Sequence, residues 1–292
     1  MKASVSLNAR PLFRALCGLL FTCTALLAMA RRADAQVYVS LTTAGVVSEY
    51  DEKTGEVINA SFITGLNGPN ELRLSREVLF IANDAGSVGT YDAKTGAAIN
   101  PSFITGTSFA PIGLALSGDD LFVANGNDGT VGQYDAKTGN VINATFITGL
   151  ASPSPCGLGR LGNSLFVTDT VGNVLGKYSA KTGKSSGTVA VTYPYGIAFS
   201  GNKLFVGAKK EDGDGFTIAE YDAKTVKVIK ADFITGLSYP WQIAVLGDKL
   251  FVTNGGAGTV GEYDAKTGKV INGAFISGLA DPFGIVVKAQ SK

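Results

Sequence analysis

The feature that most constrains this chain is a six-fold internal repeat. The phrase Tyr-Asp-Ala-Lys-Thr-Gly, or a close variant, recurs every 41 to 44 residues, beginning at Tyr50, Tyr91, Tyr134, Tyr178, Tyr221 and Tyr263. Each copy also holds an apolar run of the Leu-Phe-Val type, and a proline that precedes a segment of the Gly-Leu-Ala-Leu type. Repetition at this period is typical of chains built from one supersecondary unit that stacks on its neighbours.

Within one copy the pattern predicts four short strands. Runs of five to eight residues rich in Val, Phe, Ile and Thr alternate with turns rich in Gly, Asp and Asn, and no segment shows sustained helical periodicity. A lone sheet of this size cannot bury both faces, whereas six sheets in a ring cover one another. The sequence therefore predicts an all-β fold: a six-bladed β-propeller of four-stranded antiparallel blades.

The two ends of the repeat region predict how the ring closes. After residue 35 the chain opens on a second strand, Gln36–Leu41, and it finishes on a first strand, Phe283–Lys288. One blade is then completed by the N-terminal strands plus the C-terminal strand, which hold the ring by ladder hydrogen bonds. We expect residues 36–292 to form a single domain.

Residues 1–35 have the pattern of a secretory signal peptide. Lys2, Arg10 and Arg14 precede an uncharged apolar run over residues 15–30, and an Ala-x-Ala site ends at Ala35. Cleavage is expected after Ala35, or alternatively at the Ala-x-Ala site that ends the apolar run. The other interpretation is a retained anchor, but 16 apolar residues fall short of the ~20 that a span needs. We therefore expect a secreted or periplasmic protein with no membrane span after cleavage.

Composition excludes several classes of function. The chain has no histidine, which removes Ser-His-Asp and Cys-His nucleophile systems and histidine-ligated zinc or haem. The net charge is +1 and no basic run lies outside the N-terminus, so we expect no nucleic-acid partner. Cleavage leaves Cys156 alone, so the exported chain would have no internal disulfide. These exclusions favour a non-catalytic protein over an enzyme.

Three motifs of the repeat resemble those of NHL-repeat propellers. They are Pro-x-Gly-Ile/Leu-Ala, then Gly-Asp/Asn-x-Leu-Phe-Val, then Val-x-x-Tyr-Asp, and they recur across residues 36–292. The chain is also similar to the six-bladed relatives of the gluconolactonase and strictosidine-synthase type. This resemblance implies the six-bladed fold, but not one activity, because that superfamily includes enzymes, receptors and scaffolds.

The copies differ in length at only two places. One is the loop between the second and third strands, which is longer in Lys209–Gly215; the other is the stretch from the fourth strand to the next proline, which is shortened in Ser185–Tyr193. In an up-and-down blade both connections emerge on the same side, here called the variable rim. Loops that vary on a rigid scaffold often carry function, so we expect the binding face there; the alternative is neutral drift of unconstrained loops.

The residues that follow the repeated prolines should surround the channel mouth on the variable rim. Glycine comes next in four copies, whereas Glu71 and Gln242 stand there in the other two. Arg73 replaces a small residue and shares a strand face with Glu71, so the two could form a structural ion pair or orient a ligand. The expected partner is an unknown small molecule or protein, and the predicted ligand-binding residues are Asn70, Glu71, Arg73, Tyr195, Trp241, Gln242 and Phe283.

A calcium site is the weaker prediction. Oxygen-bearing side chains end the second strands on the same rim, and hard cations such as calcium take oxygen ligands. They could equally satisfy backbone groups of their own loops, and no other cofactor is expected. The candidate metal ligands are Glu71, Asn83, Asp84, Asn125, Asp169 and Asn254.

Two functions follow from these observations. The first is an exported, non-catalytic binding or interaction protein whose site lies at the channel mouth on the variable rim. The alternative is a calcium-dependent hydrolase of the gluconolactonase type, in which the resemblance implies a channel-mouth cation held by Glu, Asn and Asp side chains. The residues that match this mouth position in five of the copies are not metal ligands, which favours binding; these are Ile112, Cys156, Tyr195, Trp241 and Phe283.

Overall fold

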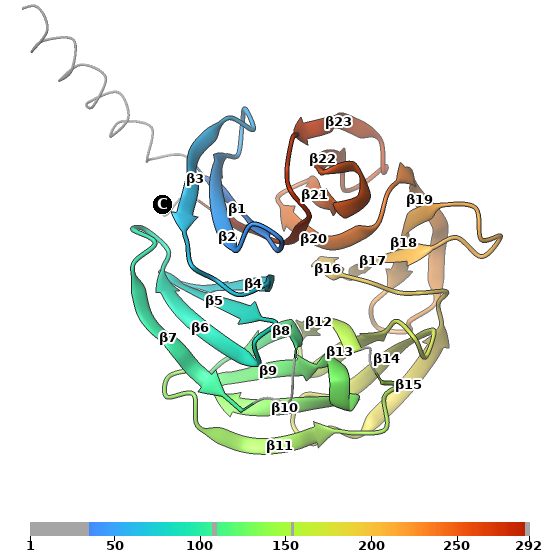
Figure 1. Ribbon diagram of the computed structural model, residues 1–292. Helices are drawn as coiled ribbons and strands as arrows, with labels where there is room; N and C mark the ends of the chain where they lie inside the picture. Colours follow the sequence, from blue (N-terminus) through green and yellow to red (C-terminus); the bar gives the residue numbers. More distant parts are fainter. Residues whose placement is uncertain (1–34, 107–109, 153–154, 290–292) are drawn as a thin grey trace, which may run out of the picture.

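The computed structural model describes residues 35–106, 110–152 and 155–289. In these ranges the chain forms six four-stranded antiparallel sheets arranged in a ring (Figure 1). The protein is therefore an all-β, six-bladed β-propeller, and the fold class predicted from the repeat is confirmed. The predicted signal peptide lies outside the described residues apart from Ala35. Within them, no helix is both long and apolar enough to cross a membrane.

Each blade has an inner strand beside the axis, then a second and a third strand, and an outer strand at the circumference; the strands are given below in that order (Figure 1). Blade 1 contains β24 (Pro282–Lys288), β1 (Gln36–Leu41), β2 (Val46–Asp51) and β3 (Val57–Ile63). Blade 2 contains β4 (Pro69–Ser75), β5 (Val78–Asn83), β6 (Ser87–Asp92) and β7 (Ala98–Thr105). Blade 3 contains β8 (Pro111–Ser117), β9 (Asp120–Asn125), β10 (Thr130–Asp135) and β11 (Val141–Ile147). Blade 4 contains β12 (Pro155–Leu161), β13 (Ser164–Asp169), β14 (Val174–Ser179) and β15 (Ser185–Ala190). Blade 5 contains β16 (Ile197–Ser200), β17 (Lys203–Lys209), β18 (Phe216–Asp222) and β19 (Val228–Leu237). Blade 6 contains β20 (Pro240–Leu246), β21 (Lys249–Asn254), β22 (Thr259–Asp264) and β23 (Val270–Ile276).

Because neighbouring strands are antiparallel, the connections divide between two rims. The loops between second and third strands share one rim with the connections between blades, and the short turns within each hairpin occupy the other. The two places where the copies vary in length therefore do lie on one rim, the variable rim. We call the opposite side the constant rim. Two short 3₁₀ turns, Gly126–Asp128 and Gly255–Ala257, also lie on the variable rim.

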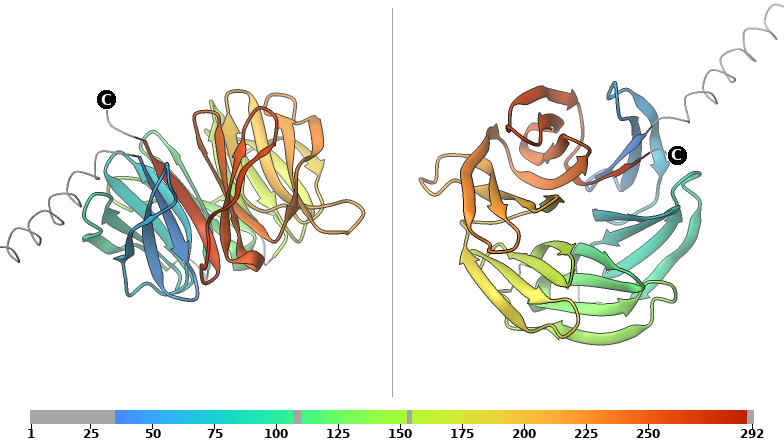
Figure 2. Two further views of the ribbon diagram at one scale, coloured as in Figure 1. Left: turned by 90° about the horizontal axis from the view of Figure 1, so that it is seen from above. Right: turned by 180° about the vertical axis from the view of Figure 1, so that it is seen from behind.

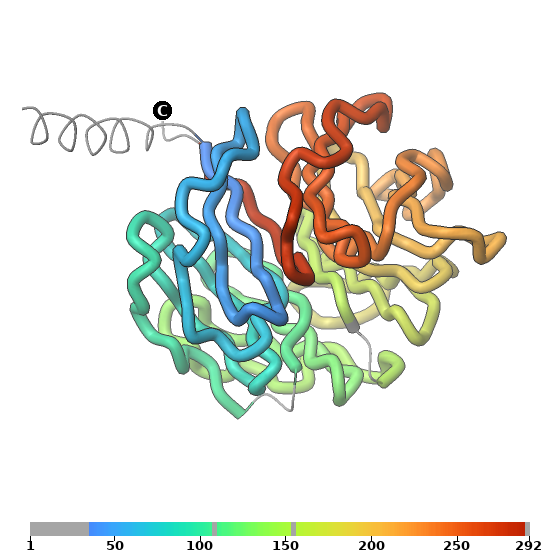
Figure 3. The backbone as a smooth tube through the Cα atoms, turned by 45° about the horizontal axis from the view of Figure 1, so that its top comes forward, coloured from blue at the N-terminus to red at the C-terminus, as the bar shows by residue number. Residues whose placement is uncertain are grey.

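The ring is closed in blade 1 by strands from opposite ends of the chain. Strand β24 pairs antiparallel with β1, from Gln36 opposite Lys288 to Leu41 opposite Pro282. Figures 2 and 3 show the C-terminal strand beside the N-terminal one, between blades 6 and 2. Strand β1 has the predicted bounds, and β24 begins one residue earlier than predicted. Closure by ladder hydrogen bonds removes the open sheet edge that β1 would otherwise present.

The core is divided into six clusters, one at each interface between neighbouring blades. Between blades 1 and 2, for example, Tyr38 and Phe62 pack with Leu72, Leu79 and Tyr91. Such burial stabilises by roughly 25 cal/mol for each Å² of apolar surface removed from water. Every blade thus shields its neighbours, and no blade has a core of its own.

Blade 4 departs from the repeat, and so does the next blade. In five blades the carbonyl oxygen of the fourth-strand phenylalanine lies against a glycine in the turn of the next blade. A Cβ on Gly183, for example, would lie 2.1 Å from the oxygen of Phe146. Strand β15 lacks this phenylalanine. The turn that faces β15 has Val226 in place of glycine, with φ of 58° and its side chain buried in the cluster between blades 4 and 5. The one blade without glycine in this turn therefore follows the one blade without the fourth-strand phenylalanine.

The inner strand of blade 5 begins later than the repeat predicts. The proline precedes it at Pro194, yet β16 starts only at Ile197. The Gly196 N–H bonds instead to the carbonyl of Trp241 in blade 6 at 2.9 Å, and the Tyr195 N–H bonds to the carbonyl of Gly207 at 2.7 Å. This segment therefore joins two blades at the channel mouth.

Candidate functional site

Aromatic rings gather at the channel mouth over blades 5, 6 and 1. The Trp241 ring stacks on Phe283, with centroids 5.1 Å apart and planes at 18°. Tyr195 meets Trp241 edge-on at 5.0 Å, and Tyr239 stacks on its other side at 5.9 Å. Phe216 continues the row, 4.5 Å from Tyr239. Three of the predicted ligand-binding residues therefore form one aromatic row, with Trp241 and Phe283 half-buried and Tyr195 buried.

The opposite half of the mouth is polar and closed by internal contacts. The Asn70 side-chain amide donates to Asp84 Oδ1 at 2.7 Å and to the carbonyl of Pro111 at 3.3 Å. Cys156 is buried, and burial, with the nearby charge of Glu71, raises the pKa of its thiol to about 12. The thiolate that a nucleophile needs is therefore scarce at neutral pH.

Glu71 and Arg73 form the ion pair that their spacing suggested. The Glu71 side chain is fully buried; its Oε1 pairs with the Arg73 guanidinium, and its Oε2 accepts the Leu114 N–H at 2.9 Å. The Arg73 Nη2 also donates to the carbonyl of Leu158 at 2.8 Å. Burial raises the pKa of Glu71 to about 7, although Arg73 and the Leu114 N–H both act to lower it. The pair thus links the inner strands of blades 2, 3 and 4, as a structural ion pair would.

Gln242 is the remaining predicted ligand-binding residue, and it is 2% exposed. Its backbone N–H donates to Thr253 Oγ1 at 2.9 Å, and its side-chain oxygen accepts the Ile243 N–H at 3.2 Å. A Cβ placed on Gly196 would lie 2.3 Å from that oxygen. Gln242 therefore packs against blade 5 below the mouth.

The candidate calcium ligands are spread over four blades. Asp84 accepts the hydrogen bond from Asn70, and Asp169 accepts the N–H groups of Gly172 and Ala151 at 2.8 and 2.6 Å. Among the described residues, no three His, Cys, Asp or Glu side chains are grouped closely enough to hold a metal ion. Both aspartates thus accept hydrogen bonds within the protein, Asp169 through both of its oxygens. The amides of the set each have a buried oxygen without a hydrogen-bond donor; they are Asn83, Asn125 and Asn254.

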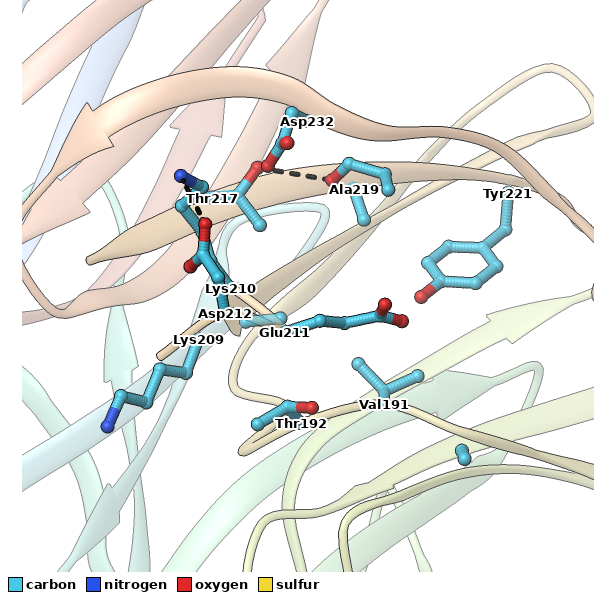
Figure 4. A pocket seen from close by; sticks show the side chains of 13 residues that line it. Val191, Thr192, Lys209, Lys210, Glu211, Asp212, Thr217, Ala219, Tyr221 and Asp232 are labelled. Atoms are coloured by element: carbon cyan, nitrogen blue, oxygen red, sulfur yellow. Dashed lines mark hydrogen bonds and ion pairs between the residues drawn. The ribbon is translucent and has the colours of Figure 1, made fainter. Parts of the chain in front are cut away.

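A hollow of about 470 Å³ lies on the variable rim between blades 4 and 5, and the sequence did not predict it (Figure 4). Much of its wall comes from the two segments in which the copies depart from a common length, and the rest from β17, β18 and β19. The shortened connection contributes Val191 and Thr192, and the longer loop contributes Lys209, Glu211 and Asp212. The sequence could have indicated this hollow, because the two length changes fall in neighbouring blades.

Tyr221 lines the hollow, and the residue two positions before it differs from that of four other blades, which have glycine there; blade 1 has Ser48. In blade 3, for example, a Cβ on Gly132 would lie 2.7 Å from the ring of Tyr134. Blade 5 has Ala219 at the matching position, so the Tyr221 ring cannot lie as the ring does in those four blades, and it faces the hollow instead. Burial, followed by the charge of Glu211, raises the pKa of the Tyr221 hydroxyl to about 12.

Charged side chains cross the opening of the hollow. Lys210 pairs with Asp212 at 3.2 Å, while Glu211 extends across the space towards Tyr221 (Figure 4). The Lys209 ammonium lies over the ring of Tyr193, 6.0 Å from its centroid. The hollow therefore presents acidic, basic and hydroxyl groups within one space, which suits a polar occupant.

Comparison with known proteins identifies the fold and no family. No protein-family model matches the sequence, and no curated protein matches it. The crystal structure of a nidogen/laminin complex contains a chain that superposes with a TM-score of 0.72 at 15% identity, over 88% of this chain and 100% of that one. A computationally designed protein, Ika8, superposes with a TM-score of 0.52 at 14% identity, over 88% and 94% of the two chains. The class that these comparisons support is the β-propeller.

Proposed function

We propose that this chain is an exported, non-catalytic β-propeller that binds a ligand or partner at its variable rim. The observation that carries the proposal is a pair of exposed tyrosines, Tyr193 and Tyr239, which immediately precede the prolines of blades 5 and 6. Their φ angles are 44° and 51°, and their exposed fractions are 46% and 47%. A bulky side chain in this region is uncommon, and such conformations cost about 1 to 3 kcal/mol.

Packing against Phe216 and Trp241 offsets part of that cost for Tyr239, yet almost half of each tyrosine remains in water. This backbone conformation recurs before the prolines of other blades, at Gly68, Ala110 and Asp281 with φ of 61°, 68° and 53°, so what distinguishes blades 5 and 6 is the large exposed ring at this position. Strained residues that persist on a surface cluster at binding sites. The two tyrosines also connect the features described above, because Tyr239 joins the aromatic row and Tyr193 borders the hollow through Lys209.

The chemistry of the rim fits a polar occupant with a flat or aliphatic face. Tyr193 and Tyr239 can stack on that face of the occupant, while Glu211 and the Tyr221 hydroxyl can form hydrogen bonds with its polar groups. A saccharide or a basic side chain of a partner protein has both properties. The similarity to a chain from a nidogen/laminin complex supports a protein partner, because a propeller of this fold occurs there in a complex.

Native mass spectrometry of the exported protein tests this proposal. We expect the wild-type chain to retain a co-purifying species that the double variant Tyr193→Ser, Tyr239→Ser loses. The matched control is Val57→Ser with Val141→Ser, because these two side chains are similarly exposed on outer strands at 57% and 59%. Equal retention by the rim variant and the control would refute a site at the variable rim.

Export and the absence of catalysis have tests of their own. Amino-terminal sequencing of the exported chain should begin at Gln36, and a cell-retained chain that begins at Met1 would contradict export. We expect calcium and EDTA to leave the melting temperature unchanged, because a metal bound only by the folded state would raise it by mass action. A rise in calcium that EDTA reverses would favour the hydrolase instead.

A further inference from the structure

A second cavity occupies the central channel at the constant rim, the end opposite to the proposed binding face. It measures about 340 Å³, within the range of ligand-binding pockets. All six inner strands contribute to its wall, each through residues near its carboxyl end. The buried contact between Glu71 and Arg73 lies on the channel side of blade 2, between this cavity and the variable rim.

The wall of this cavity is apolar except for two arginines. Arg73 and Arg160 line it, and no acidic side chain does. Arg160 occupies the position at which the other five inner strands carry an apolar residue. The apolar lining at that position is Leu74, Leu116, Phe199, Val245 and Val287.

The two arginines come from different blades, and Arg73 reaches the strand that carries Arg160. Arg73 extends from β4 and donates to the Leu158 carbonyl of β12 at 2.8 Å. Arg160 is two residues further along β12, which is about 7 Å of extended chain. The internal contacts of Arg73 therefore hold its guanidinium beside the strand that carries Arg160.

The two arginines differ in how their charge is satisfied. Arg73 is engaged within the protein, by Glu71 and by the carbonyl of Leu158. Arg160 is exposed and, within the described part of the chain, has no ion pair or side-chain hydrogen bond. Arginine is always charged and presents five N–H donors in a planar fork that matches a carboxylate. A cavity with apolar walls and one unpaired guanidinium is thus complementary to an amphipathic anion.

We propose that the channel cavity at the constant rim binds a small organic carboxylate with an apolar body. The carboxylate lies against Arg160, with Arg73 as the fixed neighbouring donor, and the apolar body contacts the leucine, valine and phenylalanine side chains of the other blades. This site is independent of the variable rim and involves no reaction.

Isothermal titration calorimetry on the folded chain tests this proposal with three matched probes. Octanoate and 4-phenylbutyrate carry the carboxylate, 4-phenylbutanamide is the neutral analogue, and 4-phenylbutylamine is the cationic one. We expect a carboxylate to bind and both analogues to bind at least about tenfold more weakly, because a hydrogen bond to a charged group is worth roughly that much. Failure of both carboxylates to bind at millimolar concentration would overturn the proposal, as would equal binding of the amide.

Variants at Arg160 locate the site. Arg160→Met keeps the aliphatic stem and should weaken carboxylate binding about tenfold or more, while Arg160→Lys should restore part of the affinity. The control is Arg76→Met, since Arg76 is an exposed arginine on the β4–β5 turn outside the cavity. Unchanged affinity in Arg160→Met, or an equal loss in Arg76→Met, would refute the assignment.

A chemical readout separates binding from folding. Phenylglyoxal modifies exposed guanidinium groups, and peptide mass spectrometry identifies which arginine reacted. Bound carboxylate should protect Arg160 and leave Arg76 reactive. Equal modification of Arg160 with and without a saturating carboxylate would place that carboxylate elsewhere and overturn the proposal.

Discussion

Replacing Thr168 by valine tests how the blades are held together at the channel. Thr168 lies on β13 and is fully buried. Its hydroxyl accepts the Gly157 N–H of its own blade at 2.7 Å and donates to the Tyr195 carbonyl of blade 5 at 2.6 Å. One side chain therefore satisfies two backbone groups that belong to adjacent blades.

The same bridge recurs in two other blades of the ring. Ser40 accepts the Gly284 N–H at 2.7 Å and donates to the Asn70 carbonyl at 2.6 Å, from blade 1 to blade 2. Thr253 donates to the Phe283 carbonyl at 2.7 Å, from blade 6 to blade 1. The other three blades have no hydroxyl at this position, where they carry Ala82, Ala124 and Gly207.

The expected cost follows from the two backbone groups that the substitution leaves unpaired. Valine has nearly the shape of threonine, so Thr168→Val creates no cavity and isolates the loss of hydrogen bonding. A buried polar group without a partner costs about 1 to 3 kcal/mol, so two of them should lower the free energy of unfolding by about 2 to 6 kcal/mol. For a domain of this size that corresponds to a fall in melting temperature of roughly 5 to 20 °C.

Urea denaturation of the chain from residue 36 onward measures this change. Trp241 is the single tryptophan, and its ring packs on Tyr195, so its fluorescence reports the interface that Thr168 bridges. The control is Thr188→Val on β15, because Thr188 is exposed and has no side-chain hydrogen bond among the described residues. A Thr168→Val variant within about 0.5 kcal/mol of the wild type, the range of ordinary surface changes, would refute the reasoning.

Three further predictions address closure, titration and the repeat itself. Deleting residues 283–292 removes nearly all of β24 and leaves β1 unpaired, so we expect an aggregated protein in size-exclusion chromatography; a monomer with native circular dichroism would contradict the closure. The pKa of Glu71 is raised to about 7 from 4.5, so its stabilising contribution is complete below pH 4.5 and lost as pH rises through 7. Wild-type stability should therefore fall by about 3 kcal/mol over this window, whereas Glu71→Gln, followed by urea denaturation at each pH, should lack that decline. Gly183→Val should destabilise the chain severely, because its Cβ meets the Phe146 oxygen. Val226→Gly should have a much smaller effect, because glycine relieves the left-handed backbone at φ of 58° and so offsets the loss of the buried side chain; similar melting temperatures for these two variants would refute this reasoning.

The sequence determined the architecture because the same short motifs recur six times, and this recurrence indicates how distant parts of the chain pack together. Six copies of a Tyr-Asp-Ala-Lys-Thr-Gly turn and its strands admit few arrangements that bury both faces of each sheet, and the unmatched strands at Gln36–Leu41 and Phe283–Lys288 required closure between the chain ends. The pairing of Glu71 with Arg73 was also predictable, since residues two apart on a strand share a face.

Tertiary structure decided everything that depends on contacts between blades. Val226 departs from the repeat in sequence, but only the structure shows that it is buried between blades 4 and 5, beside the one outer strand without the repeated phenylalanine. The position of Tyr221 in the hollow depends on Ala219 and on the length of a connection from another blade. Arg160 is a candidate ligand-binding residue only because the six inner strands place it in the wall of one cavity. A repeat specifies what each unit is, whereas a site between units depends on side-chain volumes and distances that only packing sets.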